Sequence, residues 1–249
     1  GQVSDLPPRE GKLYDRFSFR RGRLILSDGT KILGFIGGTG PEGRGLALRF
    51  ALAGDRVLIG SRDPKRATDA AEAVSAQVRS GQVTGAINLV VAAEADIVFI
   101  AVPFEGHRDT LAALREPLAG KVIVDVVAPL AFSKGQARAV PVDEGSVALQ
   151  ARVVLKDSIV AAAFQTISAR DLLAPDRAID SDVVVCADDT DARRTVMALA
   201  EKIDGVRAVD GGGLENARYV EDFTALLLNI NRIYNAHSAI KITGISRLR

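Results

Sequence analysis

A glycine-rich stretch, Phe35 to Gly45, follows directly after the apolar run Ile32 to Ile36. Residues 38–43 satisfy the pattern G-x-G-x-x-G between a predicted strand and a predicted helix. One glycine of such a turn permits the tight bend, one lets the backbone approach a pyrophosphate, and one lets helix and strand pack closely. The alternative is a glycine turn with a purely structural role. We predict a dinucleotide-binding turn made of Gly38, Thr39, Gly40, Pro41, Glu42 and Gly43.

Two residues of this turn affect how well it could bind the negatively charged pyrophosphate. Pro41 suits the first helical turn, where its missing N–H is no loss, and the remaining free N–H groups and the helix dipole favour a negative charge. Glu42 is an objection, because a carboxylate near a pyrophosphate should be repelled. We therefore expect the side chain of Glu42 to point to solvent.

The segment Gly60 to Arg66 decides between the two nicotinamide cofactors. NAD-specific members of this fold place an acid about twenty residues after the glycines, where it binds the ribose hydroxyls. Here Ser61, Arg62 and Arg66 supply a hydroxyl and cations, which suit a 2′-phosphate through charge-assisted hydrogen bonds. Asp63 could be the missing acid, but it lies past the strand, where a cap of the next helix is the favoured interpretation. The segment favours NADP.

Beyond these motifs, the chain resembles the NADPH-dependent F420 reductases, also called F420:NADP oxidoreductases, over nearly all of residues 31–242. The resemblance rests on Gly37-Gly38-Thr39-Gly40 with Gly43, Gly45-Leu46-Ala47, Gly60-Ser61-Arg62, Ile100-Ala101-Val102-Pro103-Phe104-Glu105, Val184 to Asp189 with Val196-Met197, and Asp204-Gly205. It implies a Rossmann domain that holds NADPH and a smaller domain that closes over it. It also implies the deazaflavin coenzyme F420, bound between them as co-substrate, and a homodimer.

The same resemblance implies roles for individual residues. Thr39, Ser61, Arg62 and Arg66 fall at the adenosine and 2′-phosphate end, and Val102 and Pro103 fall beside the nicotinamide. The loop Gln165-Thr166-Ile167-Ser168-Ala169 lines the deazaflavin. Ala101, His107 and Ala128 complete the candidate cofactor-binding set, although for His107 an exposed position at a helix start is favoured over a phosphate or ribose contact.

Two segments depart from the family pattern near the expected deazaflavin pocket. The family has His-Thr-Ile-Pro where this chain has residues 165–168, and a Ser-Asn-Ser-Arg-like run where it has residues 215–218. Gln165 can still form hydrogen bonds but cannot carry a positive charge, and Glu215 adds a negative charge. Two alternatives to F420 reduction therefore stay open. One is an NADPH-dependent reductase of another acceptor, such as a flavin, a pterin-like ring or an imine, and the other is a non-catalytic NADP-binding protein.

The sequence predicts no catalytic acid, base or nucleophile. A hydride passes between two carbons, so the protein need only stack the rings, exclude water and fix the reacting face. Asp188, Asp189 and Asp191 beside Cys186 resemble metal ligands, but they sit at a strand-to-helix turn where aspartate commonly caps. We predict no metal.

Alternating apolar runs and helical stretches predict the elements that position these residues, and their order is typical of a doubly wound α/β fold with a parallel Rossmann sheet. Predicted strands are residues 32–36, 56–59, 97–102, 122–127, 160–164 and 183–186. Predicted helices are residues 42–52, 65–78, 108–114, 146–149, 191–203 and 215–234. In the last helix, the spacing of Val220, Phe223, Leu226, Leu227, Ile230 and Ile233 predicts one wide buried stripe.

The predicted organisation is an N-terminal extension (1–30), an NADP-binding domain (31–168) and a small C-terminal α/β domain (169–249). Ser27-Asp28-Gly29-Thr30 is a hairpin signal at the end of the extension. The formal charge of +1 and the absence of a long apolar stretch argue against nucleic-acid and membrane partners and favour small-molecule substrates. A single cysteine fits a reducing cytoplasm, which is the predicted location, although a secreted protein with few cysteines would fit it too.

Overall fold

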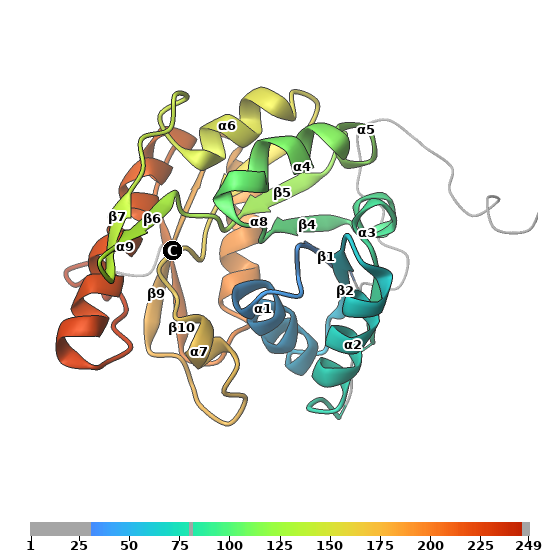
Figure 1. Cartoon of the computed structure of the whole chain (residues 1–249), viewed down its shortest axis with the longest axis horizontal. Helices are drawn as coiled ribbons and strands as arrows, with labels where there is room; N and C mark the ends of the chain where they lie inside the picture. Colours follow the sequence, from blue (N-terminus) through green and yellow to red (C-terminus); the bar gives the residue numbers. More distant parts are fainter. Residues whose placement is uncertain (1–30, 80–81, 246–249) are drawn as a thin grey trace, which may run out of the picture.

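The computed structural model describes residues 31–79 and 82–245 (Figure 1). The predicted N-terminal extension and its hairpin signal lie outside these residues. Short apolar runs form the main sheet, and every strand predicted above is present. Its strands are β1 (Ile32–Ile36), β2 (Arg56–Ser61), β3 (Val83–Ile87), β4 (Ile97–Ile100), β5 (Val122–Asp125), β8 (Ile159–Ala162), β9 (Ser181–Ala187) and β10 (Val206–Asp210).

The strands lie side by side in the order β10-β9-β8-β5-β4-β1-β2-β3. All neighbours from β8 to β3 pair in parallel, which confirms the doubly wound sheet. The chain runs outward from β1 to β3 and then returns to β4 on the other side of β1, so the strand order reverses between β1 and β4. In such sheets ligands bind outside the carboxyl ends of the strands at this point.

The last two strands extend the parallel sheet with strands of the opposite direction. β9 pairs antiparallel with β8, and β10 pairs parallel with β9, so both run opposite to the other six. They extend the same sheet past residue 169, the predicted domain boundary. The division into two domains stays a prediction.

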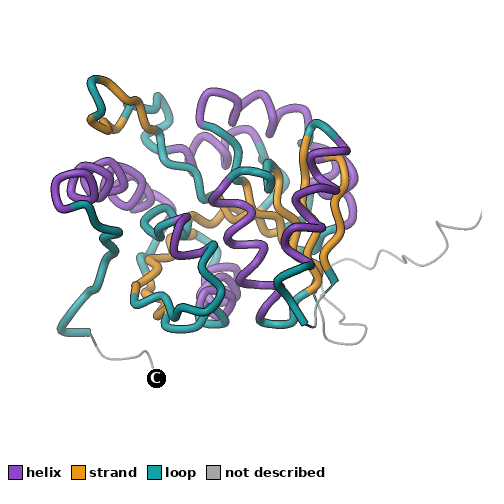
Figure 2. Tube along the Cα trace, turned by 60° about the horizontal axis from the view of Figure 1, so that its bottom comes forward, coloured by secondary structure: helices purple, strands orange, loops and turns teal. Residues whose placement is uncertain are grey.

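Helices cover both faces of the sheet (Figure 2). Their bounds are α1 (Pro41–Leu52), α2 (Pro64–Ser75), α3 (Asn88–Glu94), α4 (His107–Ala113), α5 (Arg115–Leu118), α6 (Val147–Val154), α7 (Ala169–Leu172), α8 (Thr190–Ala200) and α9 (Ala217–Tyr234), with short 3₁₀ turns η1 (Phe104–Gly106) and η2 (Leu214–Asn216). The rings of Phe35 and Phe99 stack in the core formed with α1, α2 and α8, and the ring of Phe50 packs against both at a tilt. On the other face, α3 to α6 and the start of α9 pack on alternate strand residues such as Ile36 and Ile100.

Aspartates start two of the helices. The Asp63 carboxylate accepts hydrogen bonds from the backbone N–H groups of Lys65 (2.8 Å) and Arg66 (3.3 Å), and Asp189 accepts one from Ala192 (2.7 Å). The predicted capping roles of both residues are confirmed.

A small hairpin, formed by β6 (Leu130–Ser133) and β7 (Gln136–Ala139), lies at the side of the molecule next to α9 (Figures 1 and 2). Asn229 of α9 holds it, because its side chain bonds both the N–H (3.0 Å) and the C=O (2.9 Å) of Ala137. The sequence predictions did not include this hairpin, whose attachment depends on a residue about ninety positions later in the chain.

Helix α9 departs from its predicted packing. Val220 and Leu227 are buried, but Phe223, Leu226 and Ile233 are exposed, so the prediction of one wide buried stripe is wrong for these residues. In the part of the chain that the structure describes, no helix has both the length and the apolar character needed to cross a membrane.

Candidate functional site

The predicted site residues gather at one edge of the sheet. Each predicted group directly follows, or ends, one of the parallel strands: residues 38–43 follow β1, 61–66 end and follow β2, 101–103 follow β4, 128 follows β5, and 165–168 follow β8. Because these strands are neighbours and run in the same direction, their carboxyl ends share one edge.

The glycine turn leaves room for a ligand above its backbone. Gly37 adopts a positive φ of 73°, and the N–H of Gly38 bonds to the C=O of Gly60 (3.0 Å), which ties the turn to β2. A methyl group on Gly43 would lie 2.8 Å from the Gly38 Cα, whereas one on Gly40 would meet no atom of the described residues closer than 3.8 Å. Gly43 is therefore needed for packing, and Gly40 keeps open the space beside the start of α1. Within the residues that the structure describes, no side chain caps α1, so its first N–H groups can bind an anion.

The predicted 2′-phosphate residues lie at the end of β2. Ser61 is buried and its Oγ accepts a hydrogen bond from the N–H of Asp63 (3.2 Å), which shapes the turn into α2. The side chains of Arg62 and Arg66 are exposed at this turn. Lys65 is engaged by Asp69 (2.8 Å), so the two arginines are the better candidates for binding a phosphate.

Ala101, Val102, Pro103 and Ala128 follow the two strands on the other side of β1. Val102 packs directly against the glycine turn, because a Cβ on Gly37 would lie 2.7 Å from its Cγ1. Ala101, Val102 and Ala128 are partly buried and Pro103 is exposed. This apolar surface suits the flat face of a nicotinamide.

His107 is the clearest departure from the predicted site. Its side chain is fully buried, so the expected exposed position is wrong. Its Nε2 lies 2.7 Å from Asp125 Oδ2 and its Nδ1 lies 3.0 Å from Gln150 Oε1. Burial alone would lower the pKa of the imidazole, but the charge and hydrogen bond of Asp125 outweigh it and raise the pKa above its usual value. Both ring nitrogens have protein partners, so we do not include His107 among the proposed nucleotide contacts.

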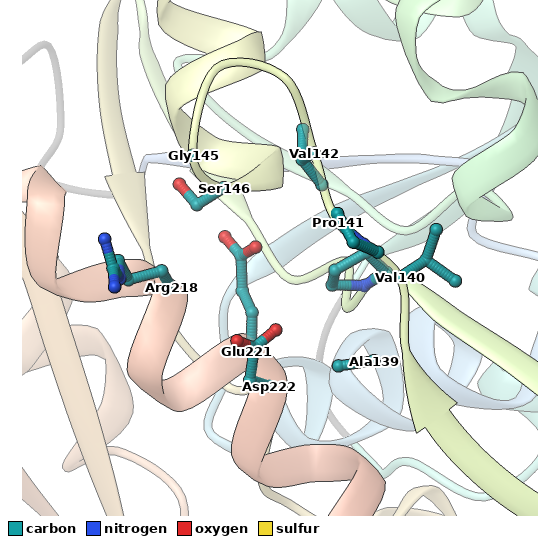
Figure 3. Close-up of a pocket in the computed structure, with 10 residues that line it drawn as sticks. Ala139, Val140, Pro141, Val142, Gly145, Ser146, Arg218, Glu221 and Asp222 are labelled. Carbon is teal, nitrogen blue, oxygen red and sulfur yellow. The ribbon is translucent and has the colours of Figure 1, made fainter.

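Glu221 of α9 is a second buried acid near this pair. Its carboxylate accepts hydrogen bonds from the N–H groups of Val147 (2.7 Å) and Ala148 (3.0 Å) at the start of α6. Burial raises the pKa of Glu221 to about 7, although the two hydrogen bonds favour the carboxylate and lower the pKa. Figure 3 shows the carboxylate pointing from α9 toward the loop with Ser146, in a cavity of about 280 Å³ that Arg218 and Asp222 also line.

The predicted acceptor residues, Gln165 to Ser168, line a larger cavity of about 470 Å³ beside the second half of α9. Gln165 donates from Nε2 to the C=O of Asp125 (3.0 Å), and its own C=O accepts from Thr224 Oγ1 (3.0 Å). The side-chain Oε1 of Gln165 is buried and has no hydrogen-bond partner in the described part of the chain. A buried amide oxygen without a partner is costly, so this atom is ready to accept a bond from a ligand.

Glu42 lines the same cavity, which contradicts the expectation that it points to solvent. The residue is partly exposed, yet its carboxyl atom Oε1 is buried and has no hydrogen-bond partner among residues 31–79 and 82–245. Burial raises the pKa of this carboxyl from 4.5 to about 8. At pH 7 the neutral form of Glu42 is then favoured, which weakens the objection to an anion at the neighbouring turn.

Four residues of this region were not predicted from the sequence to lie at the site: Asp125, Gln150, Glu221 and Thr224. Asp125 could have been found from the sequence, because it is the one charged residue within the apolar run 122–127. The others lie on helices, where polar residues usually face solvent, and only their long-range contacts reveal a buried role.

Comparison with known proteins identifies the family of this chain. The family model described as "NADP oxidoreductase coenzyme F420-dependent" matches residues 32–129. The F420-dependent NADP reductase of Methanothermobacter thermautotrophicus is 44% identical over 219 residues, covering 84% of this chain and 94% of that protein. The enzyme of the same name from Methanocaldococcus jannaschii is 37% identical, covering 86% and 98%.

Solved structures support the same fold. A crystal structure of a protein from Arthrobacter sp. FB24 has a TM-score of 0.71 and 29% sequence identity, and the match covers 86% of this chain and all of that chain. Given relatives of this identity that match along nearly their whole length, the chain belongs to the family of F420-dependent NADP reductases.

Proposed function

We propose that the protein transfers a hydride between NADPH and the deazaflavin coenzyme F420. The observation that carries this proposal is the pair of relatives named F420-dependent NADP reductase, each matched over more than nine-tenths of its own length. The chain is then an NADP-dependent oxidoreductase with F420 as co-substrate.

The glycine turn and the end of β2 would hold the NADPH. The first N–H groups of α1 bind the pyrophosphate in the space that Gly40 leaves open, and Ser61, Arg62 and Arg66 bind the adenosine end with its 2′-phosphate. Ala101, Val102, Pro103 and Ala128 then form the wall beside the nicotinamide. The room above Gly40 and the apolar wall fit such a nucleotide.

The acceptor would bind in the cavity lined by residues 165–168 and the second half of α9. The unpartnered Oε1 of Gln165 fits a ligand with a hydrogen-bond donor, such as the ring N–H of a deazaflavin. The deazaflavin supplies a carbon that accepts the hydride directly. The protein's part is to hold both rings in register and to exclude water.

The direct test is to mix the purified protein with NADPH and oxidised F420. Bleaching of the deazaflavin absorbance, with loss of NADPH in equal amount, is the expected result. NADPH binding without bleaching, together with turnover of a flavin, pterin or imine, would favour a different acceptor. Binding without any turnover would leave an NADP-binding protein without catalysis.

A homodimer is the proposed assembly. Phe223, Leu226, Ile233 and Tyr219 form an exposed apolar stripe along α9, and such stripes commonly mark interfaces. Sedimentation of the native protein should give twice the monomer mass, and Leu226→Lys should shift it to the monomer. Sedimentation of the native protein at the monomer mass at micromolar concentration would refute the dimer.

A further inference from the structure

The carboxyl group of Glu42 is partly buried, although the sequence predicted that it points to solvent. It stands in the first turn of α1, a helix of twelve residues, directly after the proline of the dinucleotide turn. Its Oε1 is enclosed and bonds to no other group in the described structure. A buried polar atom without a partner is a group held ready for a ligand or for chemistry.

The surroundings of this carboxyl point toward the acceptor. Glu42 shares its cavity with Gln165, Thr166 and Ser168, the residues that follow β8. Among the described residues lining that cavity, it carries the single carboxyl group. The carboxyl therefore lies between the start of α1, which serves the nucleotide, and the acceptor loop.

We propose that Glu42 is the proton donor of the acceptor cavity, which supplies the proton that the acceptor takes up together with the hydride. The assignment rests on the proposed function. Under that function a hydride alone is not enough, because reduction of a ring such as a deazaflavin adds a hydride to a carbon and a proton to a nitrogen.

The balance of the reaction is complete with these groups. The C4–H bond of the dihydronicotinamide breaks, and both of its electrons leave with the hydride to a carbon of the acceptor, so NADPH becomes NADP⁺. The O–H bond of Glu42 breaks, and its proton goes to a ring nitrogen of the acceptor. The carboxylate left behind takes a proton from water before the next turnover, and in the reverse direction it accepts the proton.

The electrostatic setting keeps this proton on Glu42. Burial holds the pKa of the carboxyl at about 8, so the neutral acid dominates at pH 7. Besides Glu42, the charged or titratable residues that line the cavity are Arg170, Arg232 and His237. The elements around it also carry Arg44 and Arg49 on α1, Asp171 on α7, and Arg218, Glu221 and Asp222 on the first half of α9. Arg232 donates to the C=O of Gly135 (3.1 Å), and His237 pairs with Asp171 (3.0 Å). A bound pyrophosphate would add negative charge and favour the neutral acid further.

Glu42 would have a simpler role if it only stayed neutral so that the pyrophosphate can bind. The two roles predict effects on different kinetic and binding constants. A proton donor acts on kcat, whereas a neutral neighbour of the nucleotide acts only on NADPH affinity. Glu42→Gln keeps the size and neutrality of the acid but cannot release a proton, so it separates them. Glu72→Gln, on the exposed face of α2, is the matched control.

The experiment measures kcat for F420 reduction and the Kd of NADPH from pH 6 to pH 9. In the wild type, kcat should fall above about pH 8. Glu42→Gln should lower kcat by about 100-fold or more, the scale of general acid catalysis, and should remove this fall, with the Kd of NADPH changed less than about threefold. Glu42→Asp should restore part of kcat. A Glu42→Gln enzyme with wild-type kcat, whether or not its NADPH affinity changes, would overturn the assignment.

Infrared difference spectra during a pH titration give a readout apart from turnover. A protonated carboxyl band at pH 7, lost on titration through about pH 8, should be present in the wild type and in Glu72→Gln and absent in Glu42→Gln. If that band is missing in the wild type, the proton donor is refuted even when F420 is reduced. If the band is present but F420 is not bleached, the proposed acceptor fails while the buried acid stands, and turnover of another acceptor then repeats the kcat comparison.

Discussion

The imidazole Nε2 of His107 lies 2.7 Å from Oδ2 of Asp125, and neither side chain is exposed to solvent. The pair joins the start of α4 to the end of β5. Asp125 also accepts from the N–H of Val127 through Oδ1 (3.1 Å), and its C=O accepts from Gln165 Nε2 (3.0 Å). One buried aspartate therefore fixes both the loop that leads to Ala128 and the first residue of the acceptor loop.

Replacing His107 by leucine should destabilise the protein by about 3–5 kcal/mol, because it leaves the carboxylate of Asp125 buried without its charge partner. Urea unfolding at pH 6 measures this. His237→Leu is the matched control, since His237 pairs with Asp171 at 3.0 Å on the surface, and it should cost no more than about 1 kcal/mol. Equal, small losses in both variants would show that the buried pair does not stabilise the fold.

The two glycines at the start of α1 should respond differently to alanine. Gly40→Ala should leave the unfolding free energy nearly unchanged, because its methyl group meets no atom within 3.8 Å, but it should weaken NADPH binding at least about tenfold by filling the phosphate space. Gly43→Ala places a methyl group 2.8 Å from the Gly38 backbone and should cost about 1–3 kcal/mol of stability. Calorimetry and thermal unfolding measure both variants. Unchanged NADPH affinity in Gly40→Ala would place the pyrophosphate elsewhere.

The sequence predicted the local structures that depend on neighbouring residues. The glycine turn, the cap at Asp63 and the arginines after β2 all lie within a strand-turn-helix unit, where local chemistry decides the structure. The buried groups could not be predicted in this way. His107 meets a partner 43 residues away in Gln150, and Glu221 meets Val147 74 residues away. Likewise, the burial of Glu42 depends on a cavity formed with residues 165–168 and α9.

Arg62→Ala should raise the Kd of NADPH by about 10- to 100-fold, because a hydrogen bond between charged groups contributes about 1.5–3 kcal/mol. The Kd of NADH should change less than about threefold, since NADH lacks the 2′-phosphate. Fluorescence titration with both nucleotides measures this. Lys65→Ala is the control, because Lys65 already pairs with Asp69 (2.8 Å), and it should have little effect. Equal losses for NADPH and NADH in Arg62→Ala would remove the phosphate assignment.

The stability of the protein should fall as the pH rises from about 5 to 8. Burial raises the pKa of Glu42 to about 8 and that of Glu221 to about 7, so in this range the folded state holds protons that the unfolded state has released. The pKa of His107 is also raised in the folded state, so the stability that its protonated form contributes is lost as the pH rises through this raised pKa. Each carboxyl can contribute up to about 1.4 kcal/mol per pH unit.

Urea unfolding at pH 5, 6, 7 and 8 measures this slope, and Glu221→Gln should make it shallower. The matched control is Glu144→Gln. Burial raises the pKa of Glu144, but the hydrogen bond from Arg108 and the further bonds to this carboxylate outweigh burial and hold the pKa below its usual value. The contribution of this carboxylate to stability is therefore lost only at lower pH. The Glu144→Gln protein should therefore keep the wild-type slope between pH 5 and 8. A wild-type stability that rises over this range would mean that Glu42 and Glu221 are ionised in the folded protein, contrary to their burial.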